Sequence, residues 1–411
     1  MLCSTLLAQT YTWEDCLSLA RENNLALKIA REKVEAKKIS LNSLYSGLYP
    51  QLGGSLSAST GSSASGDDDL FAATPRNSES ARLSVQQQIF DAQTSPKIAQ
   101  GKSALAAEQL NYTIAEINLR LQLRQEFCTL LQTQQSLDLA KTVSDRRRQQ
   151  YELVELRYTG GLEHRGSLLT AKANLTKAEQ SEKQLQRRLD RNKLQLVQTL
   201  GLDTQDLQIT ENLQNGSGLA PHQSPNIDAL LESSPVLQAV AARLDSAKYD
   251  SAIAKNAWLP SIYANASLGK NWAQSDNVDS EDSSWSLGGS LSFDLFDGGK
   301  KTNAYNNAIL QEKIQALDFD ANKQKVKLTL IEAWDKLADA DDSILAAQEQ
   351  LKASTERSTI AAEQYANGLI SFDNWIIIED ALISAQQQEL STRIDALLQE
   401  AGWLNAKGET L

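Results

Sequence analysis

Apolar and polar residues follow two different periods along this chain. Long stretches repeat apolar residues at helical spacing, whereas four short stretches alternate apolar and polar residues one by one, as a strand with one apolar face does. The alternation predicts strands at about 51–60, 81–90, 261–271 and 284–295. It is clearest in the last, where one face would carry Trp285, Leu287, Gly289, Leu291, Phe293 and Leu295. The chain is therefore predicted to be mixed α and β.

The helical stretches predict two short helices, a long helix and a return helix in the first half. A short helix from Trp13 precedes a second one, which ends near Leu48 because Pro50 follows. The long helix would run from Pro96 to Tyr158, about 63 residues or roughly 95 Å at 1.5 Å per residue. Helix then resumes near residue 168 after a short turn, which makes a long hairpin with its tip at about 158–166.

The second half repeats this order with a nearly constant shift. Its strands are followed by a long helix from about residue 302, a tip at about 365–373 and a last helix. The matched pairs are Pro50 and Pro260, Asp91 and Asp297, and Tyr158 and Tyr365, separated by 210, 206 and 207 residues. Both long helices also carry an apolar heptad in the same frame, with Leu123, Leu130, Leu137, Tyr151 and Tyr158 in the first and Leu330, Leu337, Ile344, Leu351 and Tyr365 in the second. Seven-residue repeats of this length are typical of helices that coil against neighbours.

These patterns divide the chain into two repeats, at 10–202 and 227–408, joined by a polar linker at 203–226. Residues 1–9 are interpreted as a clipped signal peptide with the mature chain starting near Gln9, because they resemble an apolar core and a small-residue cleavage site. An ordinary disordered start and a lipid anchor at Cys3 are the alternatives.

Composition narrows the function classes. The chain has 411 residues, with 40 Lys+Arg against 52 Asp+Glu and a net charge of −12, which argues against a nucleic-acid surface. Its three cysteines form no close pair, so neither a metal site nor a disulfide framework is indicated. No catalytic constellation or phosphate loop is found, and we expect no enzyme activity and no cofactor. No apolar run reaches 18 residues, so only strands could cross a bilayer.

The strands favour a bilayer over a soluble sheet, which is the alternative. Aromatic residues are predicted at both ends of the strands, with Trp272 and Trp285 beside the acidic loop and Trp258 and Phe296 on the helix side. Such belts are typical of two membrane interfaces. Four strands cannot close a barrel, so several copies of the chain would have to share one; two copies give eight strands, and three give twelve with room for a pore.

The double repeat, the proline before each strand pair and the Tyr-x-x-Gly-Leu tips together resemble the TolC-like outer-membrane efflux family over about residues 10–408. The resemblance implies a homotrimer with a 12-stranded barrel, four strands per protomer, in the outer membrane of a Gram-negative bacterium and an α-helical barrel in the periplasm. It also implies a passive exit duct for small molecules that works with a periplasmic adaptor (membrane fusion) protein and an inner-membrane pump of the RND, ABC or MFS type.

The resemblance further implies that the tips close the periplasmic aperture and meet the adaptor. The residues matched or adjacent to the tips are Tyr158, Gly161, Leu162, His164, Arg165, Ser167, Tyr365, Gly368, Leu369, Asp373 and Asn374. Family members often place an aspartate about nine residues after the tip tyrosine, but this chain has Ser167 and Asn374 there, and Asp373 is the substitute candidate. The alternative is that these residues only form turns and have no gating role.

Two other functions remain open at the level of sequence. The same duct could serve a type I protein secretion system. From a different class, the chain could be a soluble coiled-coil scaffold or periplasmic adaptor.

Overall fold

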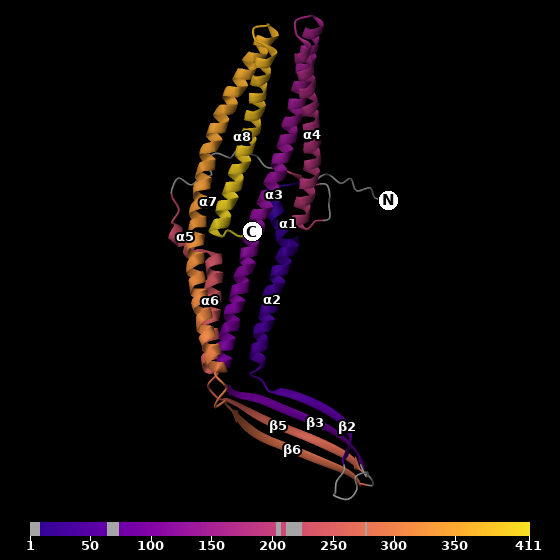
Figure 1. Ribbon diagram of the computed structural model, residues 1–411, viewed down its shortest axis with the longest axis vertical. Helices are drawn as coiled ribbons and strands as arrows, with labels where there is room; N and C mark the ends of the chain where they lie inside the picture. The colour runs from indigo at the N-terminus through magenta and orange to yellow at the C-terminus, as the bar shows by residue number, and fades with distance from the viewer. Residues whose placement is uncertain (1–8, 64–73, 203–206, 211–223, 276–277) are drawn as a thin grey trace. The chain divides into compact units, whose positions relative to one another are not determined.

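A computed structural model describes residues 9–63, 74–202, 207–210, 224–275 and 278–411 (Figure 1). The helices are α1 Trp13–Asn23, α2 Leu25–Ser46, α3 Thr94–Thr159, α4 Arg165–Leu200, α5 Ile227–Ser233, α6 Pro235–Asn256, α7 Lys300–Ala366 and α8 Phe372–Lys407. The strands are β1 Gln9–Tyr11, β2 Gln51–Ser63, β3 Thr74–Asp91, β4 Leu207–Ile209, β5 Ser261–Ser275 and β6 Val278–Ser292. Cys3, Asp67–Asp69 and His222 lie outside the described residues, as does most of the predicted linker.

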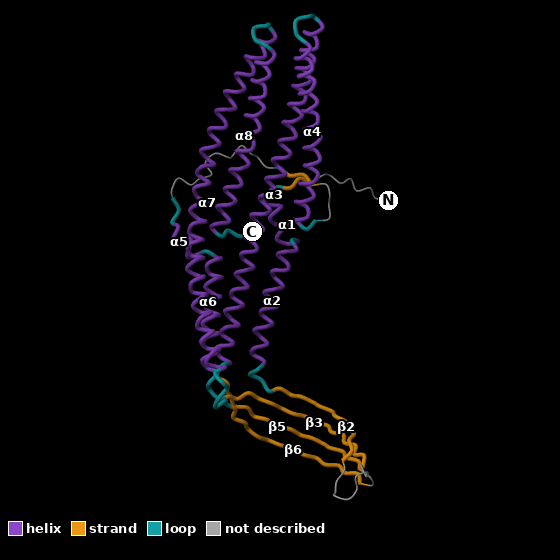
Figure 2. Tube along the Cα trace, viewed as in Figure 1, coloured by secondary structure: helices purple, strands orange, loops and turns teal. Residues whose placement is uncertain are grey.

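The two halves of the chain have the same order of elements (Figure 2). The long helices α3 and α7 contain 66 and 67 residues, and the return helices α4 and α8 contain 36 each. The prediction of a mixed α and β chain with two structural repeats is therefore confirmed.

The chain forms two compact units. One contains residues 33–109 and 238–321, with the strands β2, β3, β5 and β6, and the other contains both long hairpins. The chain passes from one unit into the other within α2, α3, α6 and α7. None of the described helices has a segment that is both long and apolar enough to span a bilayer.

The four long strands form an antiparallel sheet in the order β2-β3-β5-β6. The register places Gly54, Leu83, Leu268 and Trp285 in one row across the sheet. The next rows on this face carry Leu52, Val85, Ala266 and Leu287 on one side, and Leu56, Ala81, Lys270 and Ser283 on the other. The side chains of Leu56, Trp285 and Leu287 are more than three-quarters exposed in the single chain. The sheet therefore presents an apolar face that nothing in the described chain covers.

The opposite face of the sheet is polar. Serine pairs from neighbouring strands share hydrogen bonds there, with Oγ–Oγ distances of 2.7 Å for Ser57 and Ser80 and 2.9 Å for Ser267 and Ser286. The outer strands β2 and β6 each pair with only one other described strand. The sheet is thus two-sided, and both of its edges keep free backbone groups.

All four long strands differ from their predicted bounds, and β3 and β6 differ most. β3 begins at Thr74 instead of about residue 81, and β6 runs from Val278 to Ser292 instead of about 284–295. Both extensions are polar and show no apolar alternation, but their backbones pair with β2 and β5 over the full length. As a result Glu281 and Asp282, expected in an acidic loop, belong to a strand, and Phe293–Leu295 lie beyond it.

The heptad residues lie in two separate buried clusters. In the first, Leu123, Leu130 and Leu137 of α3 pack with residues of the neighbouring short helices, and in the second, Leu330 and Leu337 of α7 pack with Trp403 of α8. Leu123, Leu130, Leu330, Leu337 and Ile344 are at most 3% exposed, as the heptad pattern predicts. The first cluster also takes in residues from α1 and α4 and the two free, buried cysteines Cys16 and Cys128.

A two-stranded parallel sheet was not predicted. β1 pairs with β4, and the side chains of Leu207 and Ile209 enter the first core cluster. Sequence reasoning had placed β4 inside a polar linker, because three residues are too few to show a period of two.

The junctions between strands and helices match in both repeats. Pro50 and Pro260 directly precede β2 and β5. Asp91 Oδ1 accepts a hydrogen bond from Gln93 N, and Asp297 accepts from Gly299 N and Lys301 N at 3.0 and 2.8 Å. The backbone hydrogen bond from Lys301, with smaller help from those of Gly299 and Lys300, lowers the pKa of Asp297 below its ordinary value despite the opposing effect of burial. Both aspartates thus fix the turn from a strand into a long helix.

Candidate functional site

Both hairpin tips end their long helix in the same way. Gly161 N donates to Tyr158 O at 3.0 Å and Leu162 N to Arg157 O at 2.8 Å. The second tip repeats this with Gly368 N to Tyr365 O and Leu369 N to Gln364 O, at the same distances. Gly161 and Gly368 have φ of 72° and 74°, which side chains rarely allow. This pair of hydrogen bonds is the Schellman arrangement, and it explains the glycine in each Tyr-x-x-Gly-Leu motif.

The residues after each glycine start the return helix. His164 caps α4, since its Nδ1 accepts a hydrogen bond from Ser167 N at 3.2 Å. Ser371 caps α8 in the same way through Asn374 N. Ser167 and Asn374, which stand where family members often carry aspartate, therefore sit in the first turn of the return helices.

The twin tyrosines lie in different surroundings. Tyr158 is 38% exposed, whereas Tyr365 is 1% exposed. Tyr365 stacks on Trp375 with ring centroids 4.4 Å apart and meets Phe372 edge-on. Val154 and Ala171 of the first hairpin belong to the same buried cluster. The repeat in sequence is thus broken in the structure, because only the second tyrosine packs between the hairpins.

Arg157 and Glu163 of the first tip hold Tyr365 from both sides. Arg157 Nη1 donates to Tyr365 O at 3.2 Å and Ala366 O at 3.4 Å, and its guanidinium lies 4.9 Å from the centroid of the Tyr365 ring. The Tyr365 hydroxyl donates to Glu163 Oε2 at 3.0 Å. We name Arg157, Glu163 and Tyr365 the tip contact; it joins the end of one hairpin to the end of the other.

The tip contact shifts two pKa values. Burial, with help from the hydrogen bond to Glu163, raises the pKa of Tyr365 well above its ordinary value. Burial alone would raise the pKa of Glu163, but hydrogen bonds from Ser167, from the His164 backbone and from Tyr365 outweigh it and lower that pKa. Near neutral pH the acceptor is therefore a carboxylate and the donor a neutral phenol, which suits a charge-assisted hydrogen bond.

A second polar contact joins α3 to α7 and α8. Glu379, 2% exposed, accepts hydrogen bonds from Ser358 Oγ and, at 2.8 Å, from Gln150 Nε2. Arg146 Nη1 lies 3.6 Å from the Glu379 carboxylate, and Arg147 pairs with Asp380. We name these residues the shaft contact. Glu379 thus has three partners from two other helices, and removing one member of such a buried charged contact is destabilising.

Several predicted residues take no part in these contacts. Arg165 and Asp373 are exposed, and Asp373 lies in the first turn of α8. Leu162 and Leu369 are 71% and 73% exposed at the ends of the tips. Sequence reasoning did not select Arg157, Glu163, Gln150 or Glu379, because a heptad pattern marks apolar seams and gives no sign of which polar residues face another hairpin.

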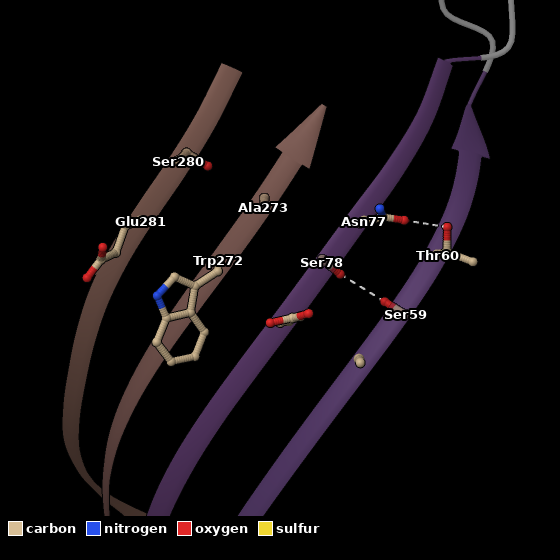
Figure 3. Close-up of a pocket in the computed structure, with 10 residues that line it drawn as sticks. Ser59, Thr60, Asn77, Ser78, Trp272, Ala273, Ser280 and Glu281 are labelled. Carbon is tan, nitrogen blue, oxygen red and sulfur yellow. Dashed lines mark hydrogen bonds between the residues drawn. The ribbon is translucent and has the colours of Figure 1, made fainter. Parts of the chain in front are cut away.

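The aromatic residues of the sheet are not all where they were expected. Trp272 lies near the turn end of β5, between Glu79 and Glu281 of the neighbouring strands, in a hollow of about 720 Å³ (Figure 3). Lys270 lies over its ring and pairs with Glu281. Trp285 lies instead in the middle of β6, opposite Leu268, because β6 starts seven residues before it. Trp258 packs edge-on against Tyr305, and Phe296 is 89% exposed beyond β6.

The described residues contain no group of three or more His, Cys, Asp or Glu side chains arranged to hold a metal ion. The two contacts consist of hydrogen bonds, ion pairs and stacked rings. These interactions hold the helices of the two hairpins in place relative to one another.

Comparisons with known proteins agree on one family. The profile described as "Outer membrane efflux protein" matches residues 16–202 and 226–406, close to the two repeats. No functionally curated protein gives a significant match.

Three solved structures show the same fold. CusC is 18% identical with a TM-score of 0.84, over 98% of this chain and 95% of that chain. CmeC of Campylobacter jejuni, an outer membrane channel, is 17% identical with a TM-score of 0.82, over 96% and 85%. VceC of Vibrio cholerae, an outer membrane protein, is 17% identical with a TM-score of 0.81, over 96% of both chains.

Proposed function

Because the chain belongs to the outer membrane efflux protein family, a family of channels and not of enzymes, we propose that it forms the outer-membrane exit duct of a tripartite efflux system in a Gram-negative bacterium. Three copies make one duct. The duct is passive and carries small molecules, while an inner-membrane pump supplies the energy and a periplasmic adaptor connects the two.

The sheet is the observation that carries this proposal. The exposed leucines and Trp285 on one face of the sheet would be costly in water, since monomeric soluble proteins seldom expose so large an apolar patch. In a bilayer the same face is lipid-facing and the serine face lines a lumen, which is the alternation of transmembrane barrels. A soluble scaffold would leave this apolar face exposed to water.

The two open edges set the number of copies. Strands in lipid must have all their backbone groups paired, so β2 of one copy pairs with β6 of the next until the sheet closes. Two copies would give an eight-stranded barrel, whose interior side chains fill. Three copies give twelve strands and leave a pore, which a duct requires.

The tip contact and the shaft contact hold the periplasmic aperture closed. They tie the two hairpins of one protomer together through Arg157, Glu163 and Tyr365 at the tip and through Glu379 along the shaft. Opening requires the hairpins to move apart, so both contacts must break. Asp373, exposed beside the tip, adds negative charge at the aperture.

The tips are also the docking surface for the adaptor. Leu162 and Leu369 present exposed apolar side chains at the turns, and His164 and Arg165 add polar groups beside one of them. An adaptor that covers these leucines gains apolar burial and reaches the tip contact directly. Docking and opening are thereby coupled at one place.

Extraction and mass measurement test the duct. The full-length protein should remain with membranes after cell lysis, require detergent for extraction and have the protein mass of a trimer, with ion-conducting pores in planar bilayers. A soluble monomer would overturn the proposal and favour a scaffold. A type I secretion role would instead be indicated if the trimer co-purified with an adaptor and a peptide-exporting ATPase.

A further inference from the structure

The exposed face of α4 carries a row of basic side chains. This helix has eight Lys and Arg residues against three Asp and Glu. Lys183, Arg187 and Arg191 follow one another at intervals of four residues, so they lie on one side of the helix. That side is opposite to the one that buries Leu189 and Leu196 in the first core cluster, and all three cations are exposed. We name these three residues the basic stripe.

A row of acidic side chains lies on the exposed face of α7. Between residues 332 and 349 this helix has six carboxylates and one lysine. Five of the carboxylates lie opposite to the buried Leu337 and Ile344, and all five are exposed. Three of them are spaced seven residues apart, which is the period of a seam between coiled helices. We name the five the acidic stripe: Glu332, Asp335, Asp339, Asp342 and Glu349.

Each stripe places like charges beside one another without compensation. Like charges four residues apart, such as Arg187 and Arg191 or Asp335 and Asp339, destabilise a helix. Within the described part of the chain, no side chain of either stripe forms an ion pair. Charges of the opposite sign from outside the chain would therefore stabilise both stripes.

The two stripes lie on different sides of the hairpins and at the same height. Hydrogen bonds join α3 to α4, α7 and α8, whereas none joins α4 to α7 among the described residues. The hairpins belong to one compact unit, and Figure 1 shows α4 and α7 on opposite sides of them. Arg187 and Asp342 are each 26 residues from the glycine of their own tip, which is about 39 Å of helix. Arg191 and Asp339 are 30 and 29 residues from it.

We propose that the basic stripe of one copy binds the acidic stripe of the next copy along the helical shaft. This inference rests on the proposed assembly of three copies. Two different, complementary edges make a head-to-tail contact, which closes into a ring. Rotation about the ring axis moves no residue along that axis, so Arg187 meets Asp342 and Arg191 meets Asp339 of the next copy.

Exposed apolar side chains accompany both stripes. Leu194, next to the basic stripe, is 51% exposed, and Ile331 and Leu345, next to the acidic stripe, are 39% and 65% exposed. Their burial between copies stabilises the contact, since exposed ion pairs by themselves contribute little. The charges then decide which helices meet and in which register.

Zero-length cross-linking tests the contact on the full-length protein in detergent. A carbodiimide condenses an amine with a carboxylate that touches it and takes up the water released. It should link Lys183 to Glu349 and, in Arg187→Lys, also join position 187 to Asp342. Links between copies give dimers and trimers on a denaturing gel, and mass spectrometry identifies the joined peptides. Arg188→Lys is the matched control, because Arg188 is exposed about 100° further round α4 and should add no link to Asp342.

Charge reversal measures what the stripes contribute to the trimer. Arg187→Glu with Arg191→Glu should lower the temperature at which the trimer dissociates, and so should Asp339→Lys with Asp342→Lys. All four substitutions together again place opposite charges on facing helices, so the dissociation temperature should recover toward that of wild type.

The matched control for the reversal is Lys177→Glu with Arg188→Glu. It makes the same charge change on exposed residues of α4 outside the basic stripe, and should leave the dissociation temperature close to that of wild type. An intact trimer without links between α4 and α7 would overturn the contact and leave the acidic stripe to a basic partner protein. An equal loss in the control, or no recovery with four substitutions, would also overturn it.

These results separate the contact from the duct itself. An intact trimer without the links contradicts only the pairing of the stripes, whereas a soluble monomer contradicts the duct as well. If a reversed variant does not assemble, the cross-links of wild type and Arg187→Lys decide: links between copies support the contact, and their absence refutes it.

Discussion

Removing the carboxylate of Glu379 tests the proposed closure of the aperture most sharply. Glu379→Ala leaves Ser358, Gln150 and Arg146 without their shared acceptor in a nearly solvent-free position. Loss of one member of a buried charged contact costs about 3–5 kcal/mol. Arg146 is about one-third exposed and pairs at 3.6 Å, so we take the lower end of this range.

A loss of about 3 kcal/mol changes the ratio of closed to open channels by roughly 150-fold, at 1.4 kcal/mol per factor of ten. A channel that is almost always closed would then be open for a measurable share of the time. The assay is single-channel conductance in planar bilayers, with the melting temperature of the trimer measured in parallel. Glu379→Ala should increase open time far more than Glu363→Gln, which removes an exposed carboxylate of the same hairpin. If Glu379→Ala forms an intact trimer but both variants conduct as the wild type does, the shaft contact does not close the aperture.

The remaining predictions concern local structure. Gly368→Ala should lower the free energy of unfolding by about 1–2 kcal/mol, because the φ of 74° at Gly368 is left-handed. Gly402→Ala should raise the free energy of unfolding by about 0.5–1 kcal/mol, because Gly402 lies inside α8 with open space at the position of a Cβ. Thermal unfolding measures both variants, and equal effects would contradict the turn argument. The hydrogen bonds that lower the pKa of Glu163 stabilise the folded state at pH values above the ordinary carboxyl pKa, and this stability is lost as the pH falls through the pKa of the folded state. The melting temperature of Glu163→Gln should therefore fall less steeply than that of wild type below about pH 4.5. An equally steep fall in both proteins would count against this role of Glu163. Burial, with a smaller effect of Asp15, raises the pKa of Cys16 to about 12. A maleimide should therefore label Cys16 only after unfolding, which mass spectrometry of the labelled peptides measures. Rapid labelling of Cys16 in the native trimer would be inconsistent with this core.

Periodic features were predictable from sequence because their physical cause is periodic. The heptads of the two long helices pointed to Leu123, Leu130, Leu330 and Leu337, and all four are buried. The Tyr-x-x-Gly-Leu motif placed both turns, since a left-handed residue after a helix is most often glycine. Alternation found the strands wherever one face was apolar.

Contacts between elements were not predictable in this way. The polar starts of β3 and β6 are strands only because β2 and β5 pair with them. Tyr158 and Tyr365 occupy equivalent positions in the repeat, yet only Tyr365 is enclosed by Arg157, Glu163 and Trp375. The polar contacts between hairpins depend on the rotation of each hairpin toward the other. The heptad period of one helix does not specify that rotation.

The most direct measurement of the central claim is the depth and side of the sheet in a bilayer. Spin labels attached through Leu287→Cys or Ser286→Cys, in a cysteine-free background reconstituted into liposomes, report oxygen and nickel-chelate accessibility at neighbouring positions of β6. If β6 spans the bilayer with its apolar face outward, Leu287→Cys should be open to oxygen and closed to the chelate, and Ser286→Cys should be the reverse. Equal access of the chelate to both positions would place the sheet in water and contradict the duct.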